Sequence, residues 1–308
     1  MQKLNKIREA IEAADSIAIF RHQYPDMDAA GSQLGLKQAL LDLYPNKKVY
    51  AIGTMDFHES TMDIVSDDVL SHSLAILLDT ANEARIDDQR FKLCRFSIRF
   101  DHHVPVETIA DIEWVDEKAS ATCELLALYF KSMNQKISSE AAQLLYKGLT
   151  ADNIRFTIGT VRKESFLAAA YLIEQGIDVV QAEIDNFSSS LLDYQYETKV
   201  RSKAIVKEKS MTSIMQCEDY QSSHLSFKEA KEKVYALSGV REIEVWALFT
   251  ETEEGVYNAS LRSKTKSIRE IAVQYGGGGH NCASGIKGLS LDDVQEIIEK
   301  LKVRSIQE

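Results

Sequence analysis

The stretch SIAIFRHQYPDMDAAGS (residues 16–32) indicates both the fold and the place of its functional site. It begins with the apolar run SIAIF, which is typical of a strand that is buried on both faces of a sheet. His22, Asp26 and Asp28 follow directly, and the residues after them predict a helix. Because ligands bind beyond the carboxyl ends of the strands in open α/β sheets, this stretch predicts a strand, a ligand-binding loop and a helix.

Three further apolar runs repeat the pattern: KVYAIG (48–53), LAILLD (74–79) and CRFSIRFD (94–101). Segments with helical spacing lie between them, and strands that alternate with helices form a mainly parallel, doubly wound sheet. Further helices are predicted over residues 120–133, 138–150 and 163–187. The first part of the chain is therefore expected to be an α/β domain.

The pattern changes near residue 210, and a chain of 308 residues is long for one domain. New strand candidates cover residues 211–217, 243–250 and 256–262, with helices near 226–237 and 290–302. We predict a catalytic domain over residues 1–187, a helical linker over 188–209 and a smaller α/β domain over 210–308.

Composition and charge exclude several classes of protein. A formal net charge of −11 argues against a protein that coats long nucleic acids, because such binding requires many cations. No apolar stretch is long enough to span a membrane, and the N-terminus lacks a secretory signal. The four cysteines are scattered without a C-x-x-C pair, a pattern that indicates neither a disulfide framework nor a thiolate zinc site. We expect a soluble cytoplasmic protein.

Acidic residues and histidines recur at the strand ends. Asp79 ends the run LAILLD, Asp101-His102-His103 ends the last run, and Asp152 lies in the later segment GLTADNIRF. Carboxylates that converge on one sheet edge repel each other unless a cation is present. Imidazole and carboxylate ligands suit Mn²⁺, with Mg²⁺, Co²⁺, Fe²⁺ or Zn²⁺ as alternatives, and the candidate ligands are too many for one ion. Two ions are expected, an arrangement that serves in-line phosphoryl displacement.

Each of these residues alone also fits a structural role. Asp28 and Asp79 precede segments with helical spacing, where aspartate is a common N-cap. A single histidine such as His22 is more often structural than a metal ligand. The joint occurrence of all these residues, in this order and at strand ends, favours the metal site.

Several motifs resemble those of a known family. HQYPDMDAAGS, LLDT, DHH and LTADNIRF resemble the four motifs of the DHH phosphoesterases. SLRSK (260–264) and YGGGGHNCASG (275–285) resemble the signature of the DHH-associated domain. DTANEARIDDQR (79–90) is similar to the stand-alone nano-RNase branch, so the resemblance extends over essentially the whole chain.

The resemblance implies a role for each motif residue. One metal ion would be bound by His22, Asp26 and Asp79, and the second by Asp28, Asp79, His102 and Asp152. Asp79 would bridge the ions, His103 would lie beside the nucleophile or a substrate phosphate, and Asp101 would hold the imidazoles. The sequence departs from the family pattern at Met27, where a small residue or proline is common, and at Asn153-Ile154, where Thr-Gly is frequent.

The second domain is expected to bind the substrate. Glycines let backbone N–H groups approach an anion closely, and Arg262 and His280 add donors that suit a terminal phosphate. The alternative is a structural role for both features. The glycine run would then be a flexible turn, and Arg262 would form an ion pair at the surface. The predicted substrate-binding residues are Arg262, Ser263, Gly277, Gly278, Gly279 and His280.

The resemblance also implies the substrates, which are short nucleotides that are hydrolysed to mononucleotides. Candidates are linear dinucleotides such as pApA, oligoribonucleotides of two to five nucleotides, and 3′-phosphoadenosine 5′-phosphate (pAp). A phosphodiesterase that opens cyclic di-AMP, and a nucleotide-binding regulator without turnover, stay open as alternatives. A homodimer is a further expectation from the family.

Overall fold

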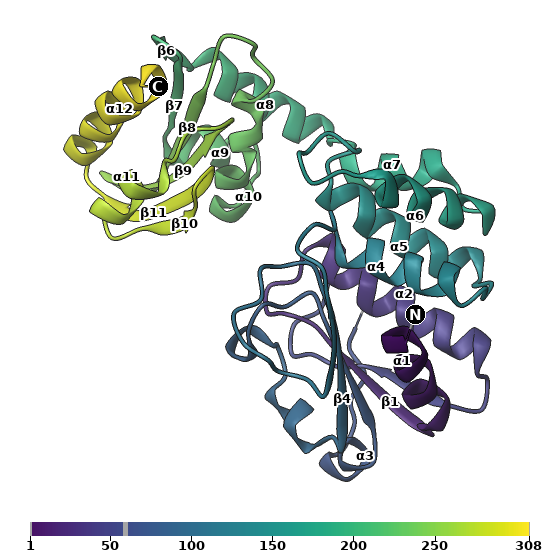
Figure 1. The fold of residues 1–308 in the computed structure, drawn as a ribbon. Coiled ribbons are helices and arrows are strands. Elements are labelled where there is room, and N and C mark those ends of the chain that lie inside the picture. Colours follow the sequence, from purple (N-terminus) through teal and green to yellow (C-terminus); the bar gives the residue numbers. More distant parts are fainter. Residues whose placement is uncertain (1, 58–60, 308) are drawn as a thin grey trace. The chain divides into compact units, whose positions relative to one another are not determined.

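The computed structural model describes residues 2–57 and 61–307, without the side chain of His280. The chain divides into two compact units, Met1–Ser188 and Ser189–Glu308 (Figure 1). The segment 188–209, predicted as a linker, contains helix α8 (Leu191–Ser202) and strand β6 (Ile205–Lys207), and both are part of the second unit. The physical reason is that Tyr196 and Val200 of α8 are buried in a core of that unit.

The first unit contains a parallel sheet with the strand order β2-β1-β3-β4-β5. Its strands are β1 (Ser16–Phe20), β2 (Lys48–Ala51), β3 (Leu74–Leu78), β4 (Phe96–Asp101) and β5 (Ile112–Val115). The predicted parallel α/β sheet is thus confirmed. The sequence analysis missed β5, because this edge strand is only half-buried and lacks an apolar run.

Helices cover both faces of this sheet. One face packs against α1 (Gln2–Ala13), α2 (Met27–Leu43), α4 (Thr122–Ser132) and α5 (Ser139–Asp152), which share its largest core. The other face packs against α3 (Asp67–Ser71) and the 3₁₀ helix η2 (Gln89–Leu93), and the short 3₁₀ helix η1 (Glu83–Arg85) follows β3. The single helix predicted over 163–187 is two helices, α6 (Lys163–Glu174) and α7 (Val179–Phe187), because Gly176 turns the chain with a φ of +86°.

Glycines allow α2 and α5 to approach each other closely. A Cβ atom on Gly31 of α2 would lie 2.6 Å from the carbonyl oxygen of Leu144, and one on Gly148 of α5 would lie 3.1 Å from that of Met27. A Cβ atom on Gly148 would also lie 3.2 Å from the Cα atom of Asp28. This packing therefore sets the position of the first turn of α2 relative to the last turn of α5.

The second unit has a mixed sheet with the order β10-β11-β9-β8-β7-β6, in which only β7 and β8 pair in parallel among the described strands. The other strands are β7 (Ser210–Met215), β8 (Val245–Glu253), β9 (Val256–Ser263), β10 (Gly278–His280) and β11 (Ala283–Leu289). Helices α11 (Arg269–Gln274) and α12 (Leu291–Ile306) pack with one core. A second core involves α8, α9 (Cys217–Gln221), α10 (Phe227–Glu232) and the 3₁₀ helix η3 (Lys233–Leu237).

No helix within the described ranges is both long and apolar enough to cross a membrane.

We predict that Gly148→Ala destabilises the first unit by about 1–3 kcal/mol, because the new methyl group would lie 2.3 Å from the Cys123 sulfur. Urea unfolding measures this change. Gly159→Ala is the matched control, since a Cβ atom there meets no atom within 4 Å. A gain in stability for Gly148→Ala, as expected for an exposed helix position, would contradict the close packing.

Candidate functional site

The structure brings the predicted metal ligands together at the carboxyl ends of β1, β3 and β4. His22 follows β1, Asp79 follows β3, and His102 follows β4. Asp28 lies in the first turn of α2 and Asp152 is the last residue of α5. Candidate ligand atoms lie within 4.8 Å of one another in three overlapping groups: His22, Asp26 and Asp79; Asp28, His102 and Asp152; and Asp79, His102 and His103.

The carboxylate of Asp79 lies between the imidazole rings of His22 and His102. One carboxylate oxygen lies 3.3 Å from Nε2 of His22, and the other lies 3.4 Å from Nε2 of His102. Its backbone has a φ of +55°, a strained region for a residue with a side chain. Thr122 holds the carboxylate through a hydrogen bond of 3.1 Å. Strain of this kind is common at functional sites, and here it accompanies a carboxylate that faces both imidazoles.

Both imidazoles direct Nε2 into the cluster. The Nδ1 atom of His22 lies 2.7 Å from the carbonyl oxygen of Gln23, and Nδ1 of His102 lies 3.3 Å from that of Ala119. A hydrogen bond from Nδ1–H to a carbonyl group leaves Nε2 available as a metal ligand.

Two aspartates of the cluster also contact the N-termini of helices. Asp26, rather than Asp28, is the N-cap of α2, and its Oδ1 accepts a hydrogen bond of 3.0 Å from Ala29. Asp28 accepts hydrogen bonds from the backbone N–H groups of Thr122 and Cys123 in the first turn of α4, at 2.6 and 2.9 Å. These contacts fix the carboxylates, and each aspartate still has a carboxylate oxygen within reach of the candidate metal-binding groups.

The close packing of the cluster shifts the pKa values of several of its side chains. Burial and the charges of Asp79 and Asp152 raise the pKa of Asp28, and burial is the main cause that raises the pKa of Asp152 to about 6. Burial opposes the charged form of both histidines, yet close carboxylates raise the pKa of each to about 10: Asp26 and Asp79 beside His22, and Asp79, Asp28 and Asp152 beside His102. Without a metal ion, positive imidazolium groups therefore balance the crowded carboxylates.

The donor set fits divalent cations. The contacts of His22 and His102 with the surrounding carboxylates are 3.3–3.9 Å long, which exceeds a good N–H···O hydrogen bond of about 2.7–3.2 Å. Ligand atoms that share one cation at about 2.1 Å lie roughly 3–4 Å apart. Imidazole and carboxylate groups at this spacing are the ligands expected for a divalent metal ion.

A buried arginine that the sequence analysis missed supports the DHH motif. Arg99 is fully buried, and Nη2 of its guanidinium lies 2.5 Å from Oδ2 of Asp101. The other oxygen of Asp101 lies 2.8 Å from Nδ1 of His103. The available signal was a basic residue in the strand run FSIRFD, two positions before Asp101, and the structure shows that this residue orients Asp101.

The two departures from the family pattern near Asp152 form one tight turn. Asn153 is buried, and its Oδ1 accepts a hydrogen bond of 2.8 Å from the backbone of Phe156. Ile154 has a φ of +47°, a region that favours glycine, and its side chain is half exposed. Met27, the third departure, is the first residue of α2. None of these residues displaces a candidate ligand from the cluster.

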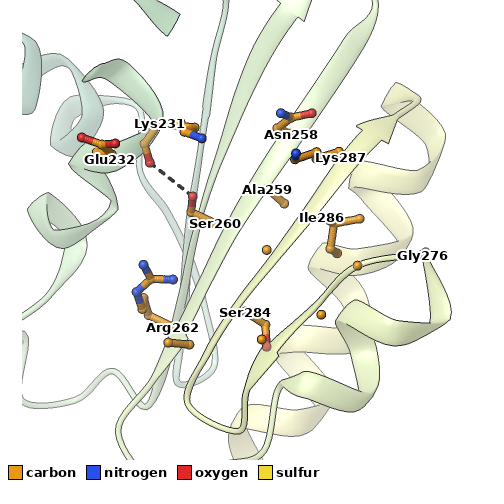
Figure 2. A pocket seen from close by; sticks show the side chains of 15 residues that line it. Lys231, Glu232, Asn258, Ala259, Ser260, Arg262, Gly276, Ser284, Ile286 and Lys287 are labelled. Atoms are coloured by element: carbon orange, nitrogen blue, oxygen red, sulfur yellow. Dashed lines mark hydrogen bonds between the residues drawn. The ribbon is translucent and has the colours of Figure 1, made fainter. Parts of the chain in front are cut away.

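The second unit contains a cavity of about 730 Å³ over β9 and β11, with the glycine run at its border (Figure 2). Arg262, Gly277, Gly278 and Gly279 line it, as do Asn258 and Ser260, which the sequence analysis missed. Ser263, which was expected to bind substrate, lies on the opposite face of β9, where its hydroxyl donates to the carbonyl oxygen of Lys266. The prediction for His280 concerns a side chain outside the described part of the chain.

The chain resembles known proteins along its whole length. Residues 16–149 match the model described as "DHH family, N-terminal domain", and residues 219–304 match the "DHHA1 domain". A Streptococcus mutans protein named "Probable bifunctional oligoribonuclease and PAP phosphatase NrnA" is 34% identical, with 98% of this chain and 99% of that protein covered. A Bacillus subtilis protein, "Bifunctional oligoribonuclease and PAP phosphatase NrnA", is 31% identical, with 95% of each covered.

A solved structure shares the fold. The exopolyphosphatase-related protein from Bacteroides fragilis superposes with a TM-score of 0.86 at 24% identity, over 98% of this chain and 96% of that one.

We predict that metal binding releases protons, because a metal ion requires the neutral imidazole whereas the pKa of His22 and His102 is about 10 in the metal-free site. Near neutral pH, Mn²⁺ should release roughly one proton per imidazolium, and its affinity should increase as the pH rises toward that pKa. Titration calorimetry in buffers with different ionisation enthalpies measures the proton count. His22→Gln should lower it, and His72→Gln, at an exposed histidine outside the cluster, should not. A heat that does not depend on the buffer would contradict the prediction.

Proposed function

Because this chain belongs to the DHH family, with an N-terminal DHH domain and a DHHA1 domain, we propose that it is a metal-dependent phosphoesterase that hydrolyses very short nucleotides. The proposed substrates are linear dinucleotides such as pApA, oligoribonucleotides of two to five nucleotides, and pAp, and the products are mononucleotides. The names of the relatives in S. mutans and B. subtilis support RNA and pAp. The observation that carries the proposal is Asp79, whose two oxygens face two different imidazoles.

The metal ligands are proposed in two sets that share Asp79. The first set is His22, Asp26 and Asp79, and the second is Asp28, Asp79, His102 and Asp152. Mn²⁺ suits the mixture of imidazole and carboxylate donors, with Mg²⁺, Co²⁺ or Fe²⁺ as alternatives. When bound, divalent cations supply Lewis acidity to a scissile phosphate and lower the pKa of a water nucleophile.

His103 and Asp101 are proposed to handle a proton at the reacting phosphate. The contact of 2.8 Å between Asp101 and Nδ1 of His103 leaves Nε2 of His103 for a substrate oxygen. Arg99 pairs with the same carboxylate, so Asp101 stays ionised, and the pKa of Asp101 is lowered by His103 and Arg99 even though burial opposes this.

The cavity over β9 and β11 of the second unit, called the groove from here on, is proposed to bind the terminal phosphate of the nucleotide. Arg262 is half-buried, and its one hydrogen bond to another described residue goes to the carbonyl oxygen of Leu261, so the guanidinium has further donors for a ligand. Gly278 and Gly279 border the cavity beside it without a side chain, so that a phosphate can approach their backbone closely, whereas the N–H group of Gly277 already donates to the carbonyl oxygen of Ala272. A homodimer and a cytoplasmic location stay predictions, and analytical ultracentrifugation and cell fractionation measure them.

We predict that the full chain with Mn²⁺ turns over pApA, pAp and a five-nucleotide RNA, and that EDTA abolishes this activity. Asp79→Asn and His102→Gln should each lower kcat at least about 100-fold, because each removes a ligand of the cluster. Initial rates of mononucleotide release measure the effect, and cyclic di-AMP is assayed in parallel as the alternative substrate.

Asp68→Asn is the control for charge, since Asp68 is exposed and lies outside the cluster, and it should keep the wild-type rate. Faster turnover of cyclic di-AMP than of pApA would replace the proposed substrate class. Nucleotide binding that raises Tm without any product would instead establish a silent regulator.

A further inference from the structure

The groove of the second unit is longer than one phosphate requires. Asn258, Ser260 and Arg262 alternate along β9 and line the same face, whereas Ala259 and Leu261 between them are buried in the core, with Ala259 also bordering the groove. At about 3.3 Å per residue, the backbone positions of Asn258 and Arg262 lie about 13 Å apart. Figure 2 shows Arg262 at one end of this row and Asn258 beside Lys287 at the other.

The floor between the two ends is made of small residues. In the register of the sheet, Ala283 of β11 lies opposite Arg262, and Gly285 lies opposite Ser260. A Cβ atom at Gly285 would meet only the carbonyl oxygen of Ala259, at 3.6 Å, so the absence of a side chain there leaves open space. An extended ligand can therefore lie along the strands from one end of the groove to the other.

The far end of the groove offers hydrogen-bond donors. Oδ1 of Asn258 accepts a hydrogen bond of 3.1 Å from the backbone of Gly288, which leaves the amide NH₂ group as the free part of this side chain. Lys287 lies beside it, and Lys231 of α10 lines the opposite side. Among the described residues that line the groove, Glu232 is the one acidic residue, so this lining carries a net positive charge in a strongly acidic chain.

The cations that line the groove have no carboxylate partner among the described residues, unlike several lysines elsewhere in the second unit. Lys203, Lys207 and Lys233 each pair with a carboxylate. Arg262, Lys231 and Lys287 form no ion pair with any carboxylate in the described ranges. Lys231 instead places its ammonium group 5.9 Å from the centre of the Phe227 ring. Cations that gather around a cavity without acidic partners are available to an anionic ligand.

We propose that Lys287, Lys231 and Asn258 form a second phosphate subsite, which binds a backbone phosphate of an oligonucleotide whose terminal phosphate lies at Arg262. This inference rests on the proposed function. In pAp and pApA, one phosphate reacts and the other occupies the Arg262 end, so no phosphate remains for the second subsite. Longer oligonucleotides carry an additional phosphate, and the subsite would lower KM for them alone.

The test compares Lys287→Gln and Lys231→Gln with wild type in the full chain loaded with Mn²⁺. Each substitution should raise KM for a 5′-phosphorylated five-nucleotide RNA about 10-fold, the effect of one charge-assisted hydrogen bond, without a change in kcat. KM for pAp and pApA should stay within a factor of two. The dependence of log KM for the RNA on log salt should become less steep by about 0.7 per lost phosphate contact.

Lys228→Gln is the matched control, because Lys228 is an exposed cation of the same helix as Lys231 but does not line the groove. Equal effects of all three substitutions, or equal effects on pAp and RNA, would overturn the subsite. An altered preference between guanine and adenine RNAs with an unchanged salt dependence would also overturn it, since a base would then occupy this end. If wild type cleaves no substrate, the proposed function fails, and fluorescence anisotropy of the same RNA in EDTA still tests the subsite.

Discussion

The repulsion among Asp28, Asp79 and Asp152 constrains the first unit more than any other interaction does. These carboxylates share the environment of two imidazoles, and Asp28 and Asp79 are almost completely shielded from water. Carboxylates that are crowded together away from water are tolerated only when protons or cations balance their negative charge. The raised pKa values of His22 and His102 show how the metal-free protein meets this requirement, and divalent ions meet it without the protons.

The surrounding fold serves to hold these charges in place. Asp28 receives two N–H groups from the start of α4, Asp79 receives the hydroxyl of Thr122, and the glycines of α2 and α5 bring the ends of those helices together. Arg99 neutralises Asp101 from the interior. Each of these contacts joins the site to the core, so that the geometry of the cluster depends on packing as well as on the ligands.

Much of this arrangement could be predicted from the sequence, because continuous apolar runs mark β1 and β3 and polar residues follow them directly. The edge strand β5 and the glycine-rich strand β10 could not, since half-buried residues and glycines carry no strand signal. Ser263 was predicted to bind substrate as part of the motif SLRSK, but alternation along β9 turns it to the other face of the strand. The role of Asn258 depends on a contact with Gly288, which is distant in the sequence.

The most direct test of the account is the electron paramagnetic resonance spectrum of the Mn²⁺-loaded protein, measured together with its metal content. Because the two oxygens of Asp79 face His22 and His102, two ions held by the proposed ligand sets would share one carboxylate. The account predicts two Mn²⁺ ions per chain with an exchange-coupled spectrum, and loss of the coupling in Asp79→Asn. A single bound ion, or two ions with independent spectra in the wild type, would contradict it.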